Sequence, residues 1–251
     1  MKAHANFKIN LGLHITRKRD DGFHDLETIF YPIDTLQDII EMEPAEEVVF
    51  EMRKGDFQID SEKNLCVKAF RMLQKEFGLR GARITLEKNI PSGAGLGGGS
   101  SDAASVLKMT NELVNLQRAN ELLKKFAEKL GSDVPFFIEN RPCYATGKGE
   151  NLSPIPLDLS AKTIKIFKPD FSISTAEAYS LITPKSGRRN LKEIVGHPIE
   201  NWKNLLVNDF EAPLFKKYPE LAEIKKKFYN EGAIFAALSG SGSAIFGIFD
   251  N

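Results

Sequence analysis

The chain has 251 residues, enough to bury a large hydrophobic core in one large domain or two smaller ones. Its 34 basic and 34 acidic residues give a formal net charge of zero, which argues against nucleic-acid binding as the main function. The two cysteines, Cys66 and Cys143, are too few and too far apart for a disulfide framework or a zinc site. Because the N-terminus lacks an apolar signal segment and no apolar run is long enough to span a membrane, we expect a cytoplasmic protein without a membrane partner.

The N-terminal third of the sequence predicts strands around one helix. Residues 7–15 alternate apolar and polar side chains, which is the pattern of a strand with one buried face. Further strands are expected at residues 26–40, 47–57 and 82–89. An apolar stripe at helical spacing predicts a helix over residues 64–77.

The rest of the chain alternates helices and strands. Two helices are expected first, one beginning near Asp102 with Ser100 or Ser101 as its N-cap, the other over residues 117–130. The later elements are a strand at 162–167, helices within 175–229 and a hairpin at 233–249 that is interrupted by Ser239–Ser243. Since there is no strict repeat of strand, helix and strand, the sequence predicts an α+β protein.

A glycine-rich segment, Pro91–Ser101, is the most informative motif of the chain. Five glycines fall within seven residues, and two serines follow them. Glycine allows positive φ angles and close approach of a ligand to the backbone. Backbone N–H groups in such a loop, followed by a helix N-terminus, form a binding site for an anion such as phosphate.

Three other glycine-rich motifs and a ligand-free turn compete with this interpretation. A P-loop requires a lysine at its end, and this segment ends in Ser-Ser. The dinucleotide pattern matches at Gly93, Gly95 and Gly98, but a second helix follows where that fold requires a strand. A protein kinase would need His-Arg-Asp and Asp-Phe-Gly segments, which are missing. A flexible turn without a ligand would be entropically costly.

Two residues outside the loop are candidates for phosphoryl-transfer chemistry. Lys8 shares a strand face with Asn6 and Asn10, and taken alone it reads as a solvated lysine. Asp133 precedes Val134 and, taken alone, reads as the N-cap of a short helix. Their function therefore depends on the motifs that surround them.

The glycine-rich segment resembles the phosphate loop of the GHMP small-molecule kinases, which has the form Pro-x-Gly-x-Gly-Leu-Gly-small-Ser-small-small. Six further motifs resemble the branch of this family whose alcohol substrate carries a cytidine diphosphate, in non-mevalonate isoprenoid synthesis. They are Lys-Ile-Asn-Leu-Gly-Leu (8–13), Asp-Gly-Phe-His (21–24), Asn-Leu-x-x-Lys-Ala (64–69), Gly-Ser-Asp-Val-Pro-Phe-Phe (131–137), Ala-Thr-Gly-Lys-Gly-Glu (145–150) and Ser-Gly-Ser-Gly-Ser (239–243).

The resemblance implies an α+β, two-domain GHMP kinase fold. An N-terminal ATP-binding domain, similar to a ribosomal-protein domain, is expected at residues 1–153. A ferredoxin-like α/β domain that is shortened at its C-terminus is expected at residues 154–251. It also implies ATP as co-substrate, Mg²⁺ with few dedicated protein ligands and within reach of Ser100 or Ser101, and a monomer or weak homodimer.

The resemblance also implies the roles of individual residues. Lys8 and Asp133 would be catalytic, with Lys8 pairing with Asp133 and Asp133 orienting or deprotonating the hydroxyl. The ATP-binding residues would be Asn64, Pro91, Ser92, Gly93, Ala94, Gly95, Leu96, Gly97, Gly98, Gly99, Ser100 and Ser101. The substrate-binding residues would be Asn10, Phe23, His24, Thr175 and Tyr179. His24 would hydrogen-bond the cytosine between the rings of Phe23 and Tyr179, and the Ser239–Ser243 turn would close the phosphate region.

The chain departs from the family at three positions. Phe23 stands where tyrosine is common, Phe7 where a small residue is usual, and Ser174 where proline is frequent. Three alternatives remain: a GHMP kinase for homoserine or mevalonate, a non-catalytic nucleotide-binding regulator, and an RNA-binding protein. Phe23, His24 and Tyr179 disfavour the first, since neither substrate carries a base. Intact Lys8 and Asp133 disfavour the second, and the zero net charge disfavours the third.

Overall fold

The computed structural model describes residues 1–55 and 60–251, and it consists of two compact units. Unit 1 comprises residues 1–7, 32–91 and 97–140, and unit 2 comprises residues 8–31, 92–96 and 141–251. Strands β1 (Lys2–Lys18) and β2 (His24–Ala45) pair with each other and contribute residues to both units. The glycine-rich segment likewise contributes to both.

Unit 1 contains a sheet in the order β3–β4–β2. Strand β3 (Val49–Lys54) runs parallel to β4 (Gly81–Glu87), and β4 runs antiparallel to the C-terminal half of β2. A parallel pair needs a crossover, and α1 (Leu65–Phe77) supplies it. The strand expected at residues 47–57 is confirmed over Val49–Lys54, and its end at Phe57 lies outside the described residues.

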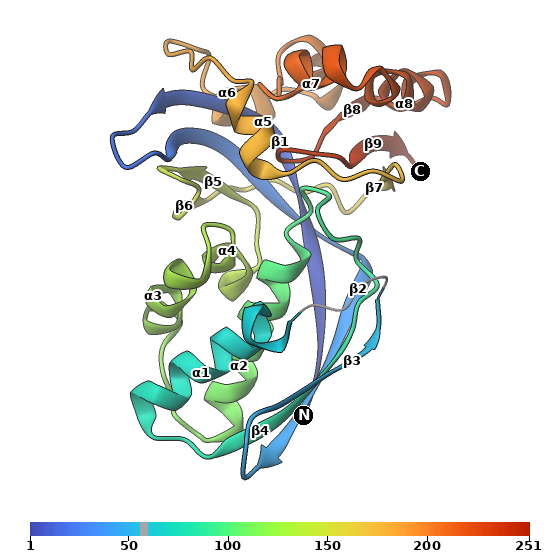
Figure 1. Ribbon diagram of the computed structural model, residues 1–251. Coiled ribbons are helices and arrows are strands. Elements are labelled where there is room, and N and C mark those ends of the chain that lie inside the picture. Colours follow the sequence, from blue (N-terminus) through green and yellow to red (C-terminus); the bar gives the residue numbers. More distant parts are fainter. Residues whose placement is uncertain (56–59) are drawn as a thin grey trace. The chain divides into compact units, whose positions relative to one another are not determined.

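The helices of unit 1 lie on one face of this sheet (Figure 1). They are α1, α2 (Gly98–Leu113), α3 (Asn120–Leu130) and α4 (Val134–Glu139), with the short 3-10 helix η1 (Ser61–Lys63) before α1. The predicted helix at 64–77 is confirmed. Asn64 caps it through a hydrogen bond from the Cys66 N–H, and left-handed Gly78 ends it.

Unit 2 contains two antiparallel sheet portions. In the first, the N-terminal half of β2 pairs with β5 (Cys143–Thr146), which pairs with β6 (Asn151–Pro154). In the second, the order is β7–β9–β8. These strands are β7 (Lys162–Phe167), β8 (Phe235–Leu238) and β9 (Ile245–Asp250). The predicted strand at 162–167 and the interrupted hairpin at 233–249 are confirmed.

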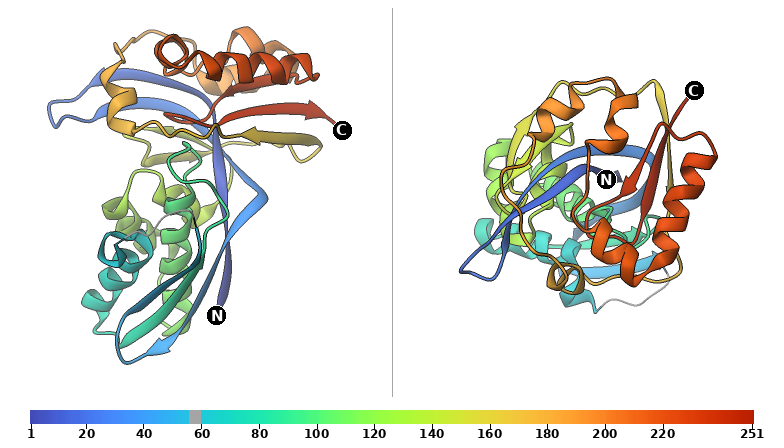
Figure 2. Two further views of the ribbon diagram at one scale, coloured as in Figure 1. Left: turned by 45° about the vertical axis from the view of Figure 1, so that its right-hand side comes forward. Right: turned by 90° about the horizontal axis from the view of Figure 1, so that it is seen from above.

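Helix α8 packs on strands β8 and β9, as Figure 2 shows. The helical elements of unit 2 are α5 (Thr175–Ser180), α6 (Leu191–Val195), η2 (Ile199–Asn204), α7 (Glu211–Lys217) and α8 (Pro219–Asn230). Leu221 and Phe228 of α8 are buried with Leu238 and Ile245 of the hairpin, which gives unit 2 a core of its own. No helix in the described ranges 1–55 and 60–251 is long and apolar enough to cross a membrane.

The expectations for β1 and α3 are wrong in part. The strand at residues 7–15 was expected to have a solvated polar face, but every residue from Ala5 to Ile15 is buried. In unit 2 the loop segment 92–96 lies against β1 and contributes to the burial of Lys8. The backbone N–H of Lys8 donates to Leu96 O at 2.9 Å. The helix expected over 117–130 begins only at Asn120, because Gln117 has a left-handed φ of 50°.

Candidate active site

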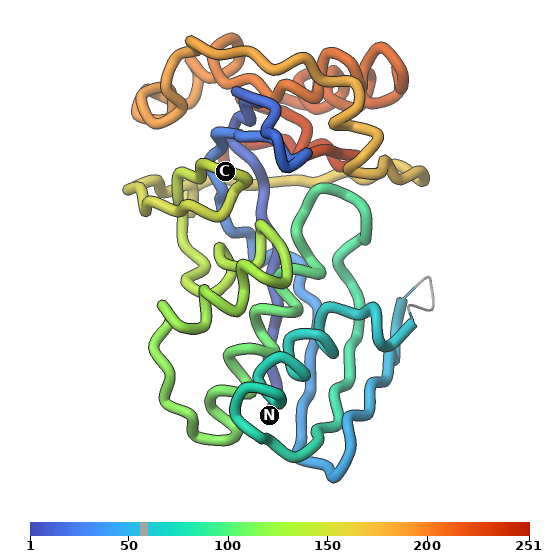
Figure 3. Tube along the Cα trace, turned by 60° about the vertical axis from the view of Figure 1, so that its left-hand side comes forward, coloured from blue at the N-terminus to red at the C-terminus, as the bar shows by residue number. Residues whose placement is uncertain are grey.

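The glycine-rich segment leaves β4, turns sharply and enters α2 (Figure 3). Three of its residues have left-handed backbone angles, with φ of 63° at Gly93, 74° at Gly95 and 72° at Gly97. A Cβ added to Gly95 would lie only 2.1 Å from the Ser239 carbonyl oxygen. At Gly95, therefore, both the backbone conformation and the space available require glycine.

Helix α2 begins differently from the prediction. Gly97 occupies the N-cap position, and no side chain caps the helix, so the expectation that Ser100 or Ser101 is the N-cap is wrong. The left-handed turn at Gly97 already directs the chain into the helix, and Ser101 N donates to Gly97 O at 2.9 Å. Both serines thus fall within the first turn, beside N–H groups that favour an anion.

Lys8 is held in one position by its surroundings in unit 2. Its residue is 2% exposed, and its Nζ donates to Asn10 Oδ1 at 2.6 Å and to Gly95 O at 2.9 Å. The ring of Phe30 adds a cation–π contact at 5.1 Å. A buried ammonium is costly unless it is compensated, so these contacts are not those of a solvated lysine.

Asn10 belongs to a chain of hydrogen bonds that orients Lys8. Its Nδ2 donates to Thr28 Oγ1 at 2.9 Å, and Thr28 Oγ1 donates to Gly12 O at 2.6 Å. Because Asn10 is 1% exposed and both of its polar atoms are engaged, its side chain positions the lysine ammonium in this structure.

The Ser239–Ser243 turn contacts the loop within unit 2. Ser239 Oγ donates to Gly95 O at 2.9 Å, and Ala244 N donates to Ala94 O at 3.1 Å. The turn therefore holds the backbone of Ala94 and Gly95. That it closes the phosphate region stays a prediction.

Asp133 lies in unit 1 at the N-terminus of α4. It occupies the N-cap position, yet its side chain makes no capping hydrogen bond to that helix. The carboxylate is therefore not used for the structural role that its local sequence suggested. The predicted pairing of Asp133 with Lys8 stays a prediction.

The residues expected to bind the cytosine base, Phe23, His24 and Tyr179, lie in unit 2. The rings of His24 and Tyr179 are 4.8 Å apart, and Tyr179 also meets Phe210 edge-on at 5.0 Å. Phe23 is 55% exposed, and the Lys148 ammonium lies 4.9 Å from its ring centre. Burial, and next the positive charge of Lys18, lower the pKa of His24 below its ordinary value.

The two remaining expected site residues occupy helix termini. Asn64 is buried, and its Oδ1 accepts the Cys66 N–H at 2.8 Å. Thr175 is the exposed first residue of α5, after Ser174, whose Oγ accepts the Glu177 N–H at 3.1 Å. Ser174 thus caps the N-terminus of α5.

A buried group of charges in unit 1 was not predicted from the sequence. Lys88 Nζ contacts Asp38 Oδ2 and lies 2.6 Å from Asp102 Oδ2. The one hint in the sequence was the acidic residue Asp102 directly after Ser101. Its partner Lys88 and the further carboxylate Asp38 are distant in the sequence, so the cluster could not be predicted. Burial raises the pKa of Asp102 to about 7, although Lys88 opposes the shift.

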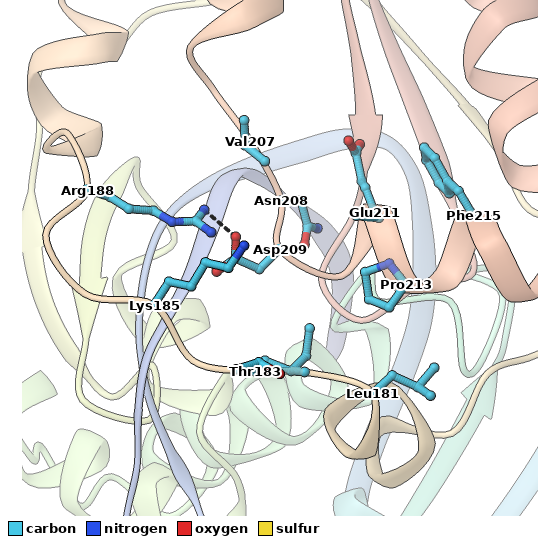
Figure 4. A pocket seen from close by; sticks show the side chains of 12 residues that line it. Leu181, Thr183, Lys185, Arg188, Val207, Asn208, Asp209, Glu211, Pro213 and Phe215 are labelled. Carbon is cyan, nitrogen blue, oxygen red and sulfur yellow. Dashed lines mark ion pairs between the residues drawn. The ribbon is translucent and has the colours of Figure 1, made fainter.

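A cavity of about 510 Å³ lies elsewhere in unit 2 (Figure 4). Arg188 and Asp209 on its wall form an ion pair, and Asp209 Oδ2 also accepts the Ile15 N–H at 2.8 Å. None of the predicted site residues lines this cavity. The cavity is therefore distinct from the predicted site.

Comparison with known proteins decides the family. The model of the GHMP kinases N terminal domain matches residues 64–141, and that of the GHMP kinases C terminal domain matches residues 189–251. The 4-diphosphocytidyl-2-C-methyl-D-erythritol kinase of Bacteroides fragilis is 48% identical over 97% of this chain and 90% of its own length. The chain belongs to the GHMP kinase family.

Solved structures of GHMP kinases agree with this assignment. The crystal structure of a 4-(cytidine 5'-diphospho)-2C-methyl-D-erythritol kinase superposes with a TM-score of 0.84 at 34% identity, covering 99% of this chain and 90% of that one. A homoserine kinase from Cytophaga hutchinsonii superposes with a TM-score of 0.73 at 18% identity, over 98% of this chain and 86% of that one. The second likeness supports the fold alone. The two-domain α+β GHMP kinase fold is therefore confirmed.

The family models cover only part of the candidate site. The N-terminal model includes Asn64, the glycine-rich loop and Asp133, whereas Lys8 and His24 precede it. The domain boundary expected between residues 153 and 154 falls in the interval between the two models and stays a prediction.

Proposed function

We propose that this GHMP kinase transfers the γ-phosphoryl group of ATP to the 2-hydroxyl of 4-diphosphocytidyl-2-C-methyl-D-erythritol, in the non-mevalonate isoprenoid pathway. The observation that carries the proposal is the 48% identity, over 97% of the chain, to a kinase of that name. The glycine-rich loop, the buried ammonium of Lys8 and the ring pair of His24 and Tyr179 support it independently.

The loop supplies the anion site for the ATP phosphates. The residues Pro91–Ser101 would surround the triphosphate with backbone N–H groups, and the first turn of α2 would add its dipole. Asn64 would lie beside the adenosine. A Cβ at position 95 would clash with the Ser239 carbonyl oxygen, so only glycine fits at this point of the loop.

Lys8 and Asp133 would carry out the chemistry. The acceptor hydroxyl oxygen attacks the γ-phosphorus, the bond from that phosphorus to the β–γ bridging oxygen breaks, and ADP leaves. Asp133 would orient the hydroxyl and accept its proton, and Lys8 would offset the negative charge on the transferring phosphoryl group. Because the acceptor is a hindered tertiary alcohol, accurate positioning by these two side chains is especially important.

Mg²⁺ would be held mainly by the ATP phosphates. In the part of the chain that the structure describes, no three His, Cys, Asp or Glu side chains gather as a metal site. The hydroxyl of Ser100 or Ser101, in the first turn of α2, would complete the coordination. The ion supplies charge neutralisation of the phosphates.

The cytidine would be recognised by stacking and by hydrogen bonds. The rings of Phe23 and Tyr179 would stack on the base, and His24 would bond its polar edge. Phe23 retains the stacking face of the usual tyrosine but cannot donate a phenolic hydrogen bond. Thr175 would contact the diphosphate or erythritol portion, and Asn10 would act by positioning Lys8. We expect a cytoplasmic monomer or weak homodimer.

One assay tests the proposed reaction. Purified protein is incubated with ATP, Mg²⁺ and 4-diphosphocytidyl-2-C-methyl-D-erythritol, and ADP release is followed by a coupled enzyme reaction. We expect ADP to form in proportion to phosphorylated product. Parallel reactions contain homoserine or mevalonate in place of the substrate. Activity with one of these alcohols alone would refute the assignment, and ATP binding without any transfer would favour a regulator.

A further inference from the structure

A buried ion cluster lies between the two ends of the glycine-rich loop in unit 1. We define it as Asp38 of β2, Lys88 at the end of β4, and Asp102 of α2. The Lys88 ammonium contacts Asp38 Oδ2 and lies 2.6 Å from Asp102 Oδ2. The side chains are 0% exposed at Asp38, 9% at Lys88 and 3% at Asp102, so solvent barely screens the three charges.

The cluster contacts the chain on both sides of the loop. On the N-terminal side, Asp38 Oδ1 accepts the N–H of Asn89 at 2.6 Å and that of Ile90 at 2.8 Å, directly before Pro91. On the C-terminal side, Asp102 directly follows Ser101. The Lys88 ammonium joins the two carboxylates.

Gly98 allows the ammonium to reach this position. A Cβ added there would lie 3.0 Å from Lys88 Nζ and 2.9 Å from the Ile90 Cγ2. The first turn of α2 therefore approaches the end of β4 more closely than another residue would permit. The Lys88 ammonium therefore lies beside Gly98, the first residue of α2.

The cluster is not optimised for stability. Asp102 Oδ1 is buried and has no hydrogen-bond partner among the described residues. A buried polar atom without a partner is destabilising, and two carboxylates share one ammonium, which leaves one negative charge uncompensated when all three groups are ionised. An asparagine at position 102 would keep the bond to Lys88 without that charge.

We propose that Asp38, Lys88 and Asp102 are positioning residues that hold the two ends of the ATP phosphate loop at a fixed separation. The inference rests on the proposed function, because it assumes that the loop binds ATP. None of the three side chains needs to touch the nucleotide, since each acts through the backbone at residues 89–90 or 102. Preorganising the loop in this way reduces the ordering cost of binding the triphosphate.

Two substitutions of the same residue test the link. Asp102→Ala removes the acceptor for Lys88 and leaves Asp38 and Lys88 as a balanced pair, whereas Asp102→Asn keeps an acceptor oxygen. We expect Asp102→Ala to weaken ATP binding, measured by calorimetry, by about tenfold, which corresponds to about 1.4 kcal/mol. Asp102→Asn should restore affinity to within about twofold of wild type. Both variants lose the same charge, so the difference between them reports the hydrogen-bonded link.

Two further measurements separate positioning from general stability. Hydrogen exchange without nucleotide should show faster exchange at residues 92–99 in Asp102→Ala than in Asp102→Asn. Leu123→Ala, which truncates a buried side chain of α3, should lower Tm without changing ATP affinity or exchange in the loop. Equal affinity and exchange for the two Asp102 variants, or an equal loss of affinity in Leu123→Ala, would overturn the inference. Failure of the wild-type protein to bind ATP would instead refute the proposed function, while the exchange comparison would still decide whether the loop is held.

Discussion

The ammonium of Lys8 donates a hydrogen bond to the main-chain carbonyl of Gly95, with 2.9 Å between nitrogen and oxygen. The same carbonyl accepts the hydroxyl of Ser239 at 2.9 Å. One oxygen atom of the glycine-rich loop thus joins strand β1 to the turn before β9 within unit 2. The carbonyl of Gly95 therefore fixes the proposed catalytic side chain of Lys8 relative to the backbone of the loop that we propose binds ATP.

Removing the ammonium of Lys8 should impair turnover more than nucleotide binding. We expect Lys8→Met to lower kcat by about 10²–10³-fold, because a charge that stabilises the transferring phosphoryl group is lost. ATP affinity should change much less. Steady-state kinetics and calorimetry measure the two effects. Lys162→Met, which removes a partly exposed ion pair with Asp250, is the control and should keep wild-type kcat. Equal loss of kcat in both variants would contradict a specific role for Lys8.

Neutralising Asp133 should likewise abolish transfer and spare binding. Asp133→Asn keeps the size of the side chain but removes its ability to accept a proton. We expect kcat to fall by about 10²–10⁴-fold, the range for loss of a general base, with ATP binding retained. Unchanged turnover would exclude Asp133 from the mechanism.

A methyl group at Gly95 should disrupt the loop. Gly95→Ala combines a φ of 74° with a clash against Ser239 O. Gly187→Ala is a matched control, because Gly187 also has a φ of 74° but no atom within 4 Å of the added Cβ. The control should lose about 1–2 kcal/mol of unfolding free energy from backbone strain alone. Gly95→Ala should lose more in urea unfolding and should bind ATP poorly. A similar loss of unfolding free energy in the two variants would mean that the loop shifts enough to accommodate the added methyl group.

The imidazole of His24 should be neutral at pH 7. Burial, and next the charge of Lys18, lower the pKa of His24 below its ordinary value because both disfavour the protonated form. An NMR titration should therefore give a His24 midpoint below that of an unperturbed histidine. Protonation removes the imidazole's acceptor nitrogen, so affinity for the cytidine substrate should fall as pH decreases through this midpoint. His24→Ala should raise KM for the substrate by about tenfold, the value of one hydrogen bond, without changing KM for ATP. A change confined to ATP would contradict the assignment.

The carboxyl of Asp102 should make stability depend on pH. Its pKa in the folded protein is raised from 3.8 to about 7, chiefly by burial, with Lys88 opposing and Asp38 reinforcing the shift. The buried Cys66 thiol also lies within range of its charge. Between these two values the unfolded chain is ionised while the folded carboxyl keeps its proton, so the contribution of Asp102 to stability is greatest at low pH and declines as pH rises.

The difference between wild type and Asp102→Asn isolates this effect. We expect the unfolding free energy of wild type relative to the variant to fall by at least about 1 kcal/mol between pH 4 and about pH 8, and to stay level once the folded carboxyl is also ionised. Urea unfolding at several pH values measures it. A constant difference across the range would show that Asp102 is ionised throughout.

Much of the fold follows from local patterns in the sequence. The helix at 65–77 has an apolar stripe, Asn64 before it and Gly78 after it, and each of these signals acts within a few residues. The glycine-rich loop is equally local, because its positive φ angles are a property of glycine itself. Misplaced boundaries, as at Gly97 and Asn120, occur where a left-handed residue shifts the helix start.

The amino-acid sequence alone was sufficient to recognise the family, because its motifs and their spacing are properties of the linear chain. The same motifs predict the phosphate loop and the two candidate catalytic side chains. Only the tertiary structure shows that Lys8 is buried against Gly95 and Asn10, and that Lys88 joins Asp38 to Asp102 across separations of 50 and 14 residues. Burial and electrostatic pairing depend on distance in space. A solvated lysine and a buried, fully bonded lysine therefore share the same local sequence, and packing distinguishes them.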